Sequence, residues 1–346
     1  MRANGRTIPQ RFLVLGCGSI GKRHIRNLRA LGAREIVVFD VAPARRGEAA
    51  AAFGVKAVKK LEEAWEERPA ACVVAVPTAF HVELALEAAR RGIHLFIEKP
   101  LSHTARNVDR LLAEVRRRDI VTLVGCNLRF HPGLSQVKRL LAKEAVGRVA
   151  AARIEAGQYL PDWHPGEDYR RGYSARRALG GGVILDAIHE IDYARWLLGE
   201  VTAVTAMAAK LSRLEIDTED VAALLLRFAG GALGEIHLDY IQRAYSRTCQ
   251  IIGDEGTIRW DYTAGEVRWY SARSGRWRLF SNPPGWEPNR MYLDEMEHFL
   301  RCLERKEKPA LDAFEAARVL EIALAAKIAA RRGVRERSGT CSPGAF

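Results

Sequence analysis

A glycine-rich segment near the N-terminus constrains the fold of this 346-residue chain more than any other feature. The apolar residues 12–15 read as a short strand, Gly16-Cys-Gly-Ser-Ile-Gly21 follows at once, and residues 22–31 read as a helix. Strand, G-x-G-x-x-G and helix in this order are typical of the unit that holds the pyrophosphate of a dinucleotide. The first half of the chain is therefore predicted to be a nucleotide-binding α/β fold.

The residues of this segment have separate predicted roles. Gly16 permits the tight turn, Gly18 lets the pyrophosphate approach the backbone, and Gly21 lets the helix pack closely on the strand. The N–H groups at the helix start, where Ser19 and Ile20 lie, are free to bind phosphate oxygens. We therefore expect all five residues to form part of the cofactor site.

Asp40 predicts which dinucleotide is bound. It ends the next apolar strand, residues 35–39, at the position expected for the acid that binds the adenosine ribose. Its carboxylate would repel the extra phosphate of NADP, so NAD is favoured, although Arg45 and Arg46 could soften this preference. The alternative is that Asp40 is only a turn residue.

The alternation of strands and helices continues to about residue 124. Further strands are expected at 71–76, 93–97 and 120–124, and helices at 42–52, 61–67, 81–91 and 104–118. Such alternation predicts a parallel, doubly wound sheet, whose ligands lie at the carboxyl ends of the strands. Pro77-Thr78 and Glu98-Lys99-Pro100 fall at that edge. The alternative for Glu98 and Lys99 is two solvated residues that end a strand.

The second half is expected to begin with a crossover at residues 126–132, a helix at 133–143 and a strand at 149–159. Arg129 in the crossover could bind substrate or pin the hinge between domains. The loop that follows contains Tyr159, Trp163 and Tyr169, whose rings can stack on a sugar. The alternative for this loop is a structural lid or a subunit contact.

A second glycine run, Gly180-Gly-Gly182, leads into a helix predicted over residues 183–198. Asp186, His189 and Asp192 follow one another at spacings of three, so they would lie along one side of this helix. A histidine flanked by two acids is suited to proton transfer near neutral pH. The alternatives are a helix N-terminal acid for Asp186 and a buried, hydrogen-bonded His189. No cluster of His and Cys accompanies these residues, so we expect no metal site.

Beyond Gly199 the pattern predicts successive strands and then two helices. The strands are expected at 201–211, 221–228, 232–241, 246–252, 256–261 and 266–270, and the helices at 292–305 and 312–332. Strands joined by short glycine turns predict an antiparallel sheet. An open sheet must cover its apolar face, so we expect a homodimer or homotetramer.

Composition excludes several classes of protein. The chain carries 54 Lys and Arg against 42 Asp and Glu, yet these cations form no basic stripe interleaved with aromatics, so a nucleic-acid partner is not expected. It has no apolar run near the length of a membrane span, and residues 1–10 do not read as a secretory signal. Six scattered cysteines without a C-x-x-C pair fit a reduced, cytoplasmic setting, and the tail from Gly333 is expected to be loosely ordered.

Three motifs together resemble one family. The glycine segment, then Val73-Val-Ala-Val-Pro-Thr78 with His81, then Glu98-Lys-Pro100 are similar to the glucose–fructose oxidoreductase / inositol dehydrogenase / rhizopine catabolism (Gfo/Idh/MocA) family. The resemblance implies a Rossmann domain, residues 1–125, and a domain built on a large, mostly antiparallel open sheet, residues 126–346. It also implies that Lys99 reaches the substrate and that the Lys99–Pro100 peptide bond is cis.

The resemblance further implies a set of site residues. His189 would be the acid/base and Asp186 would assist it or bind a hydroxyl. Many relatives place the histidine four residues after the acid, whereas here the gap is three, which leaves Asp192 as a substitute. The implied cofactor contacts are Gly16, Gly18, Ser19, Ile20, Gly21, Asp40, Pro77, Thr78, His81, Glu98, Lys99 and Arg129. The implied substrate contacts are Lys99, Arg129, Tyr159, Trp163, Tyr169, Asp186 and His189.

These expectations converge on an oxidoreductase. It would use NAD, with NADP less favoured, to transfer a hydride to or from a sugar, sugar acid, nucleotide sugar or cyclitol. The segment 157–163 resembles members associated with nucleotide-sugar and nonulosonic-sugar pathways, and Arg170, Arg171, Arg176 and Arg177 favour an anionic sugar. The alternative is a regulator of the same fold that binds the dinucleotide without catalysis.

Overall fold

The computed structural model describes residues 11–163 and 165–333. The predictions made for residues 1–10, for Cys341 and for the tail beyond Gly333 lie outside these residues. The other five cysteines are buried and unpaired.

The first half forms the predicted parallel sheet, with strand order β3-β2-β1-β4-β5-β6. Its strands are β1 (Arg11–Leu15), β2 (Glu35–Phe39), β3 (Lys56–Ala57), β4 (Ala71–Val74), β5 (His94–Glu98) and β6 (Thr122–Gly125). The helices between them are α1 (Ser19–Ala30), α2 (Pro43–Phe53), α3 (Leu61–Glu66), α4 (His81–Arg90) and α5 (Val108–Arg117). Every pairing in this sheet is parallel, which confirms the doubly wound prediction.

Two details of the first half differ from the sequence prediction. The two-residue strand β3 was not predicted, because it is too short to show a pattern. The helix predicted from residue 104 begins only at Val108. The hydroxyls of Ser102 and Thr104 accept hydrogen bonds from the backbone N–H groups of Thr104 and Arg106, and such local bonds compete with the first helical turn.

The second half contains an eight-stranded sheet of order β14-β13-β12-β11-β7-β10-β9-β8. Its strands are β7 (Val149–Gly157), β8 (Val201–Ala209), β9 (Val221–Phe228), β10 (Leu233–Asp239), β11 (Ser246–Gly253), β12 (Gly256–Asp261), β13 (Glu266–Ser271) and β14 (Arg276–Ser281). All pairings are antiparallel except that of β7 with β10, so the predicted mostly antiparallel sheet is confirmed. Strand β14 was not predicted: its polar and apolar residues alternate only over Arg276-Trp-Arg-Leu279, and nearly all of its side chains are exposed.

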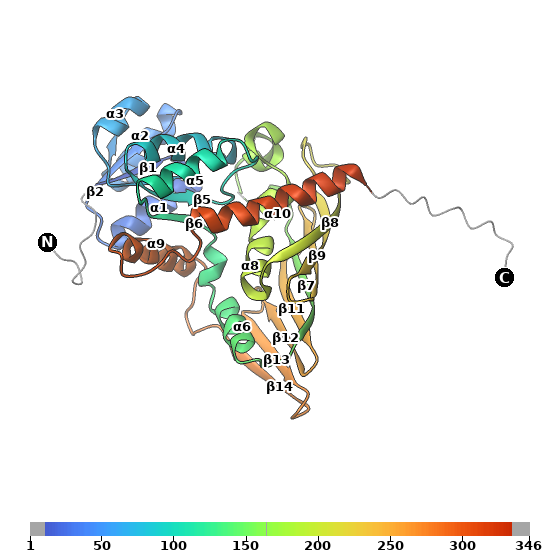
Figure 1. Ribbon diagram of the computed structural model, residues 1–346. Coiled ribbons are helices and arrows are strands. Elements are labelled where there is room, and N and C mark those ends of the chain that lie inside the picture. Colours follow the sequence, from blue (N-terminus) through green and yellow to red (C-terminus); the bar gives the residue numbers. More distant parts are fainter. Residues whose placement is uncertain (1–10, 164, 334–346) are drawn as a thin grey trace.

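One face of this sheet is covered and the other is open. Along β9 the odd-numbered positions from Ala223 to Arg227 are exposed, while Ala222, Leu224 and Leu226 are buried. The helices of the second half are α6 (Pro132–Ala142), α7 (Val183–Asp186), α8 (Ile188–Leu198), α9 (Asn289–Leu303) and α10 (Ala313–Arg332). Figure 1 shows α6, α8 and α10 on one side of the strands.

The last two helices tie the halves together. Met296, Phe299 and Leu300 of α9 belong to the same buried cluster as Phe12 and Phe96 of the parallel sheet. Helix α10 begins beside β6, where Ala313 N donates to the Thr122 hydroxyl, and then runs across to β8 (Figure 1). The division of the chain at residues 125 and 126 stays a prediction, and α9 returns to the first half after that point.

The prediction of one continuous helix over residues 183–198 is wrong. The helix is interrupted at Ala187, whose φ and ψ of −90° and 35° separate α7 from α8. The side chain of Asp186, at the end of α7, is held by four hydrogen-bond donors, which fixes its direction independently of α8. Asp186 and His189 therefore lie on different helices, and a spacing rule for a single helix does not place them.

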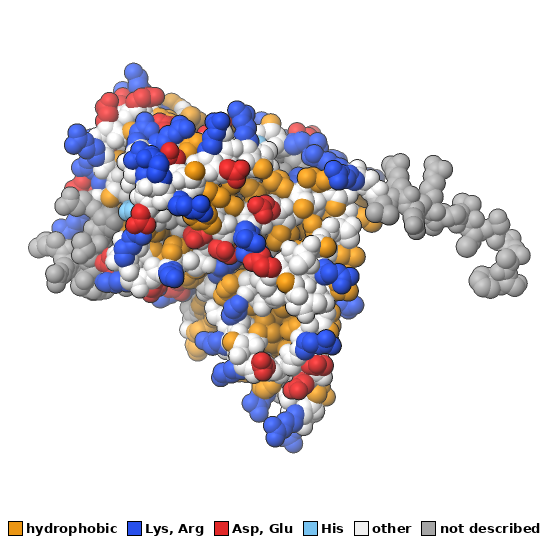
Figure 2. Space-filling view, viewed as in Figure 1, with side chains coloured by type: hydrophobic (Ala, Val, Ile, Leu, Met, Phe, Trp, Pro, Cys, Tyr) orange, Lys and Arg blue, Asp and Glu red, His pale blue; other side chains and the backbone are white. Residues whose placement is uncertain are grey.

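The surface carries charges of both signs. Figure 2 shows Lys and Arg side chains interspersed with Asp and Glu on the face drawn, without a single basic band. No helix within residues 11–333, residue 164 apart, is long and apolar enough to cross a membrane.

Candidate active site

A cleft of about 260 Å³ lies where the two halves of the chain meet. The first half contributes Arg23 of α1 and Lys99, which directly follows β5. The second half contributes Asp186 of α7 and His189 of α8, together with residues of β10, β11 and the loops beside them. The structure thus brings together the three residues that were predicted to be catalytic.

The glycine segment has the shape that a dinucleotide requires. Gly16 has a φ of +94°, and a Cβ there would collide with the carbonyl oxygen of Ala75. A Cβ on Gly21 would collide with the carbonyl of Gly16, whereas one on Gly18 would meet no atom within 4 Å. No side chain caps the N-terminus of α1 in the part of the chain that the structure describes. An open backbone before a free helix N-terminus fits a bound pyrophosphate.

Asp40 is held against this segment. Its carboxylate accepts a hydrogen bond from Cys17 N at 2.7 Å and one from Ala42 N at 2.8 Å, and the residue is 7% exposed. Arg46 donates to the carbonyl oxygen of Asp40 at 2.6 Å, so this cation is engaged by the backbone. A fixed carboxylate beside the glycine turn fits the ribose of NAD.

Glu98 and His81, which were predicted at the strand ends, do not line the cleft but are fixed close to Lys99. Glu98 lies 2.6 Å from the Nε2 atom of His24 and accepts a hydrogen bond from Lys99 N at 3.2 Å. The ring nitrogens of His81 each lie 2.8 Å from a carbonyl oxygen, that of Pro100 and that of Val76. His81 therefore joins the ends of β4 and β5.

Pro77 and Thr78 lead into α4. Thr78 is buried and packs against Gly180, where an added Cβ would approach that of Thr78 to 2.9 Å. The absence of a side chain at Gly180 thus lets the second half approach the strand ends of the first. The Lys99–Pro100 peptide bond is cis, which is also as predicted.

Lys99 is held by Asp186. Its Nζ atom donates to the Asp186 carboxylate at 3.0 Å and to the Asp186 carbonyl oxygen at 2.7 Å. The same carboxylate accepts hydrogen bonds from Tyr173 at 2.5 Å, Ser174 at 2.5 Å and Tyr240 at 3.0 Å. Asp186 is therefore the carboxylate that pairs with the Lys99 ammonium.

These contacts set the charge of both groups. Burial acts to lower the pKa of Lys99, but the neighbouring Tyr173 and Asp186 oxygens raise it well above its ordinary value. Burial acts to raise the pKa of Asp186, but Lys99 and the hydrogen bonds from Ser174 and Tyr173 lower it below its ordinary value. The pair is therefore an ammonium and a carboxylate, and Lys99 can donate a hydrogen bond but cannot accept a proton.

His189 has the opposite character. Burial, followed by the positive charges of Lys99 and Arg247, holds its pKa well below 6.5. Its Nδ1 atom is buried and has no hydrogen-bond partner among the described residues. The imidazole is therefore neutral near pH 7 and faces the same cleft as the Lys99 ammonium.

Asp192 is not beside His189. Its carboxylate forms a bidentate pair with Arg129, at 2.8 Å and 2.7 Å, and Arg129 also donates to the carbonyl oxygen of Ala310. The two side chains are 2% and 7% exposed, and neither residue lines the cleft. The geometry favours the hinge alternative for Arg129, and its predicted contacts with cofactor and substrate stay predictions.

The long loop contributes less to the cleft than its composition indicated. Of its three predicted aromatics only Trp163 lines the cleft, edge-on to Tyr240 with ring centroids 5.4 Å apart. Tyr159 lies under the guanidinium of Arg243, and the Tyr169 hydroxyl accepts a hydrogen bond from Glu215 N at 3.1 Å. The predicted substrate contacts of Tyr159 and Tyr169 have no support from this geometry.

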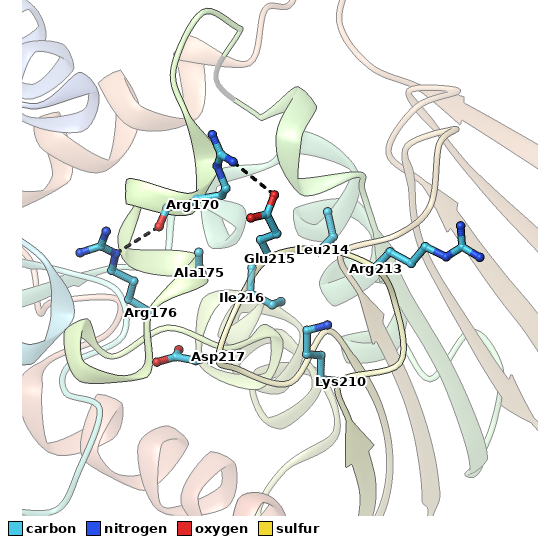
Figure 3. A pocket seen from close by; sticks show the side chains of 9 residues that line it. All are labelled: Arg170, Ala175, Arg176, Lys210, Arg213, Leu214, Glu215, Ile216 and Asp217. Atoms are coloured by element: carbon cyan, nitrogen blue, oxygen red, sulfur yellow. Dashed lines mark hydrogen bonds and ion pairs between the residues drawn. The ribbon is translucent and has the colours of Figure 1, made fainter.

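Two arginines of this loop, Arg170 and Arg176, line a different hollow of about 450 Å³, which shares no lining residue with the cleft. Figure 3 shows the side chains around this hollow. Arg170 is paired with Asp168 and Glu215, and Arg177 donates to the carbonyl oxygen of Asp217. None of these three arginines lines the cleft that contains Lys99 and His189.

Several residues of the cleft had no sequence signal. Tyr173 and Ser174 hold Asp186, but they belong to short 3₁₀ turns without periodicity. Tyr240, Tyr245 and Arg247 come from strand ends of the second sheet, and only its register brings them to the cleft. The described residues contain no group of three or more His, Cys, Asp or Glu that could hold a metal ion.

Comparison with known proteins agrees with this geometry. Residues 10–126 match the model of the oxidoreductase family with an NAD-binding Rossmann fold, and residues 134–259 match the GFO/IDH/MocA C-terminal domain. A myo-inositol 2-dehydrogenase from Thermotoga maritima is 32% identical over 332 residues, which cover 92% of this chain and 95% of that protein. The chain belongs to the Gfo/Idh/MocA family.

Solved structures of similar proteins share the fold of this family member. A levoglucosan dehydrogenase in complex with NADH and levoglucosan has a TM-score of 0.85 at 23% identity, over 93% of this chain and 97% of that one. The WlbA dehydrogenase from Bordetella pertussis, in complex with NADH and UDP-GlcNAcA, has a TM-score of 0.78 at 25% identity, over 95% and 98%. The protein is an NAD-dependent oxidoreductase that acts on CH–OH groups.

Proposed function

We propose that this oxidoreductase interconverts a secondary hydroxyl and a ketone on a cyclic polyol, with Lys99 and His189 as its catalytic residues. One observation carries the proposal. A permanently charged ammonium and a neutral imidazole face one cleft, directly beside the edge of the sheet that binds the dinucleotide. Alcohol oxidation needs both groups, because a proton must leave the hydroxyl while negative charge develops on its oxygen.

Lys99 and His189 have different roles in this reaction. Bound NAD would supply the acceptor for the hydride that leaves the carbinol carbon. His189 takes the hydroxyl proton, since its low pKa leaves the ring nitrogen unprotonated near neutral pH. Lys99 donates a hydrogen bond to the same oxygen and stabilises its developing charge. In the reverse direction the imidazolium of His189 returns the proton to the ketone oxygen.

Asp186 is a positioning residue in this scheme. Its carboxylate and carbonyl oxygens hold the Lys99 Nζ atom from two sides, at 3.0 Å and 2.7 Å. Tyr173, Ser174 and Tyr240 fix the carboxylate in turn, so the ammonium is oriented before substrate arrives. We propose that Asp40, the glycine segment, Pro77, Thr78 and Glu98 shape the NAD site.

The substrate class follows from the relatives and the lining of the cleft. The relative named myo-inositol 2-dehydrogenase has a cyclitol in its name, and two solved relatives were crystallised with sugar derivatives. Trp163, Tyr240, Tyr245 and Tyr262 line the cleft, and such rings stack on the apolar faces of sugars. We propose a sugar, sugar acid, nucleotide sugar or cyclitol as the substrate.

Turnover of two variants tests the assignment. We expect His189→Ala to lower kcat by about 10²–10⁴-fold, the usual contribution of a general base. Lys99→Ala should lower kcat by about 10²–10³-fold, as removal of an oxyanion donor does. The measurement is NADH formation over a panel of neutral cyclitols, sugars, sugar acids and nucleotide sugars, with NAD binding confirmed for each variant.

Two results would contradict the proposal. Near-normal turnover by both variants would remove Lys99 and His189 from the mechanism. A wild-type protein that binds NAD tightly but forms no NADH with any member of the panel would favour the non-catalytic regulator.

We also propose that the protein works in the cytoplasm as a homo-oligomer. The five described cysteines are free, which fits a reducing compartment. The open face of the second sheet exposes Met207, Leu225 and Leu233 at 79%, 56% and 53%, and an apolar sheet face of this kind is commonly covered by a second copy. Sedimentation of the wild type and of Leu225→Asp tests the oligomer, because the added charge should dissociate it.

A further inference from the structure

The cleft contains a cation that the proposed chemistry does not use. Arg247 on β11 lies opposite Ala156 of β7, and both residues line the cleft with His189. The Arg247 side chain is only 18% exposed. Its Nε atom lies 2.9 Å from a carboxylate oxygen of Glu190, a fully buried residue that follows His189 in α8.

The contact between Arg247 and Glu190 is close but poorly aligned. The two side chains form an ion pair at 2.9 Å, yet no hydrogen bond of good geometry joins them among the described residues. The Arg129–Asp192 pair is bidentate, so the fold can build a well-aligned arginine–carboxylate pair where it needs one. The contact with Glu190 engages the Nε atom of Arg247, and a guanidinium has four further N–H donors that can bind an acceptor in the cleft.

Arg23 adds a second positive charge to the same cleft. It lies two residues beyond Gly21 on α1, and its guanidinium stands 4.3 Å above the ring of Tyr292, which also lines the cleft. A guanidinium stacked on an aromatic ring keeps its in-plane N–H groups available for an anion. Arg23 and Arg247 therefore both present donors to the same space.

The two acids that line the cleft among the described residues are engaged by other groups. Asp186 is neutralised by Lys99. The Asp239 carboxylate accepts hydrogen bonds from the backbone N–H groups of Ile241 and Gln242 and from the Gln242 side chain, at 2.7–2.8 Å, and it lies 3.0 Å from the Nε2 atom of His237. Glu190 does not line the cleft and contacts the Nε atom of Arg247, so the other N–H groups of this guanidinium can bind a ligand.

We propose that Arg247, assisted by Arg23, binds a negatively charged substituent of the substrate, a carboxylate or a phosphate, and so selects acidic sugars. The inference rests on the proposed function, because it concerns the substrate of the same cleft. The anion site proposed here differs from the one that the sequence indicated, since Arg170 and Arg176 line the separate hollow of Figure 3. The planar guanidinium of Arg247 can donate two parallel hydrogen bonds to a carboxylate, while Glu190 contacts its Nε atom.

The test measures binding, so that it does not depend on turnover. The NADH-saturated protein is titrated by calorimetry with D-glucose, with D-glucuronate and with the phosphate ester of D-glucose at its primary hydroxyl. We expect at least one anion to bind about 10–100-fold more tightly than D-glucose, the usual worth of hydrogen bonds to a charged group. Which of the two binds more tightly distinguishes a carboxylate site from a phosphate site. Saturation with NADH keeps the phosphates of the cofactor from accounting for the result.

Three variants assign the preference to Arg247. In Arg247→Gln the ratio of anion to neutral affinity should fall about 10–100-fold. The double variant Glu190→Gln, Arg247→Gln should show the same fall without leaving a buried carboxylate unpaired, so a folding defect of the single variant cannot decide the outcome. The matched control is Arg90→Gln, which removes the same charge from the exposed last turn of α4 and should leave the ratio unchanged.

Equal affinity for all three probes in the wild type would overturn the inference, as would an equal loss for neutral and anionic probes in the double variant. The proposed function fails on a different result, namely unimpaired turnover in the Lys99 and His189 variants. The two failures are therefore distinguishable.

Discussion

The two ends of the cleft differ in how their charged groups are paired. At one end the Asp186 carboxylate accepts hydrogen bonds from Lys99, Tyr173, Ser174 and Tyr240. At the other end Glu190 and Arg247 form an ion pair at 2.9 Å whose alignment is poor for a hydrogen bond. A satisfied network is rigid and fixes geometry before substrate binds, whereas an unsatisfied pair keeps donors for a ligand. The first end is therefore suited to catalysis and the second to recognition.

The largest expected loss of activity comes from disrupting the hydrogen-bond network around Asp186. Asp186→Asn replaces a carboxylate by an amide that offers one acceptor to four donors, and it leaves the Lys99 ammonium buried without its counter-ion. We expect kcat to fall by about 10²–10³-fold, because Lys99 no longer points at the reacting oxygen. Steady-state kinetics on any substrate that the wild type oxidises measures the loss.

The pH profile separates this positioning role from a general loss of structure. Burial acts to lower the pKa of Lys99, and Asp186 opposes it. Without the carboxylate the pKa of Lys99 falls, so the variant should lose further activity at alkaline pH where the wild type does not. Ser174→Ala, which removes one donor of the four, is the matched control and should keep the wild-type profile. An Asp186→Asn enzyme within threefold of wild type would mean that Lys99 is oriented by the bound cofactor instead.

The next effect concerns stability and uses the other acid of the same stretch. Asp192→Asn breaks the bidentate pair with Arg129 and leaves a guanidinium that is 7% exposed without its carboxylate. Breaking one partner of a buried pair costs about 3–5 kcal/mol of unfolding free energy. Urea denaturation measures that loss, and kcat of the folded variant should stay within a few-fold of wild type, because neither residue lines the cleft. A loss of kcat comparable to that of Asp186→Asn would place Asp192 in the mechanism after all.

The two ends also differ in how well the sequence predicts them. Lys99 and the glycine segment were found because their positions depend on local features, a turn after a strand and a polar end to an apolar strand. Such features are set by neighbouring residues, so they can be identified without knowledge of the tertiary fold. The alternation of strands and helices predicted the parallel sheet, whereas the cis bond before Pro100 was implied by the family resemblance.

The arginine end depends on contacts between distant residues. Arg247 faces α8 only because β11 pairs with β7 in a register that sets Arg247 opposite Ala156. A shift by one residue would turn the side chain to the other face of the sheet, and nothing in the sequence around Arg247 fixes that register. The break at Ala187 is similar, because the four donors that hold Asp186 come from three separate parts of the chain. The sequence analysis favoured the long-loop arginines as an anion site because four of them lie close together. In the structure Arg170 is instead paired with Asp168 and Glu215.

The smallest expected effect is a shift in the pKa of His189 when Arg247 is replaced. The positive charge of Arg247 is one cause of the low pKa of His189, after burial and Lys99. Oxidation needs the neutral imidazole, so activity is lost as pH falls through this pKa. In Arg247→Gln one opposing charge is gone, the pKa of His189 rises toward its ordinary value of 6.5, and the acid limb of the profile moves to higher pH.

The profile of kcat/KM against pH for a neutral polyol measures this shift, because that parameter reports the pKa of the free enzyme. A neutral substrate keeps the proposed anion contact out of the comparison, and Arg90→Gln, on the exposed last turn of α4, controls for the change in net charge. Movement of the acid limb in Arg247→Gln alone would show that recognition and proton transfer are coupled through the field of a single guanidinium. An anion bound to Arg247 would then offset that field, so an acidic substrate would raise the basicity of the group that deprotonates it. An acid limb at the same pH in both variants would mean that the two ends of the cleft work independently.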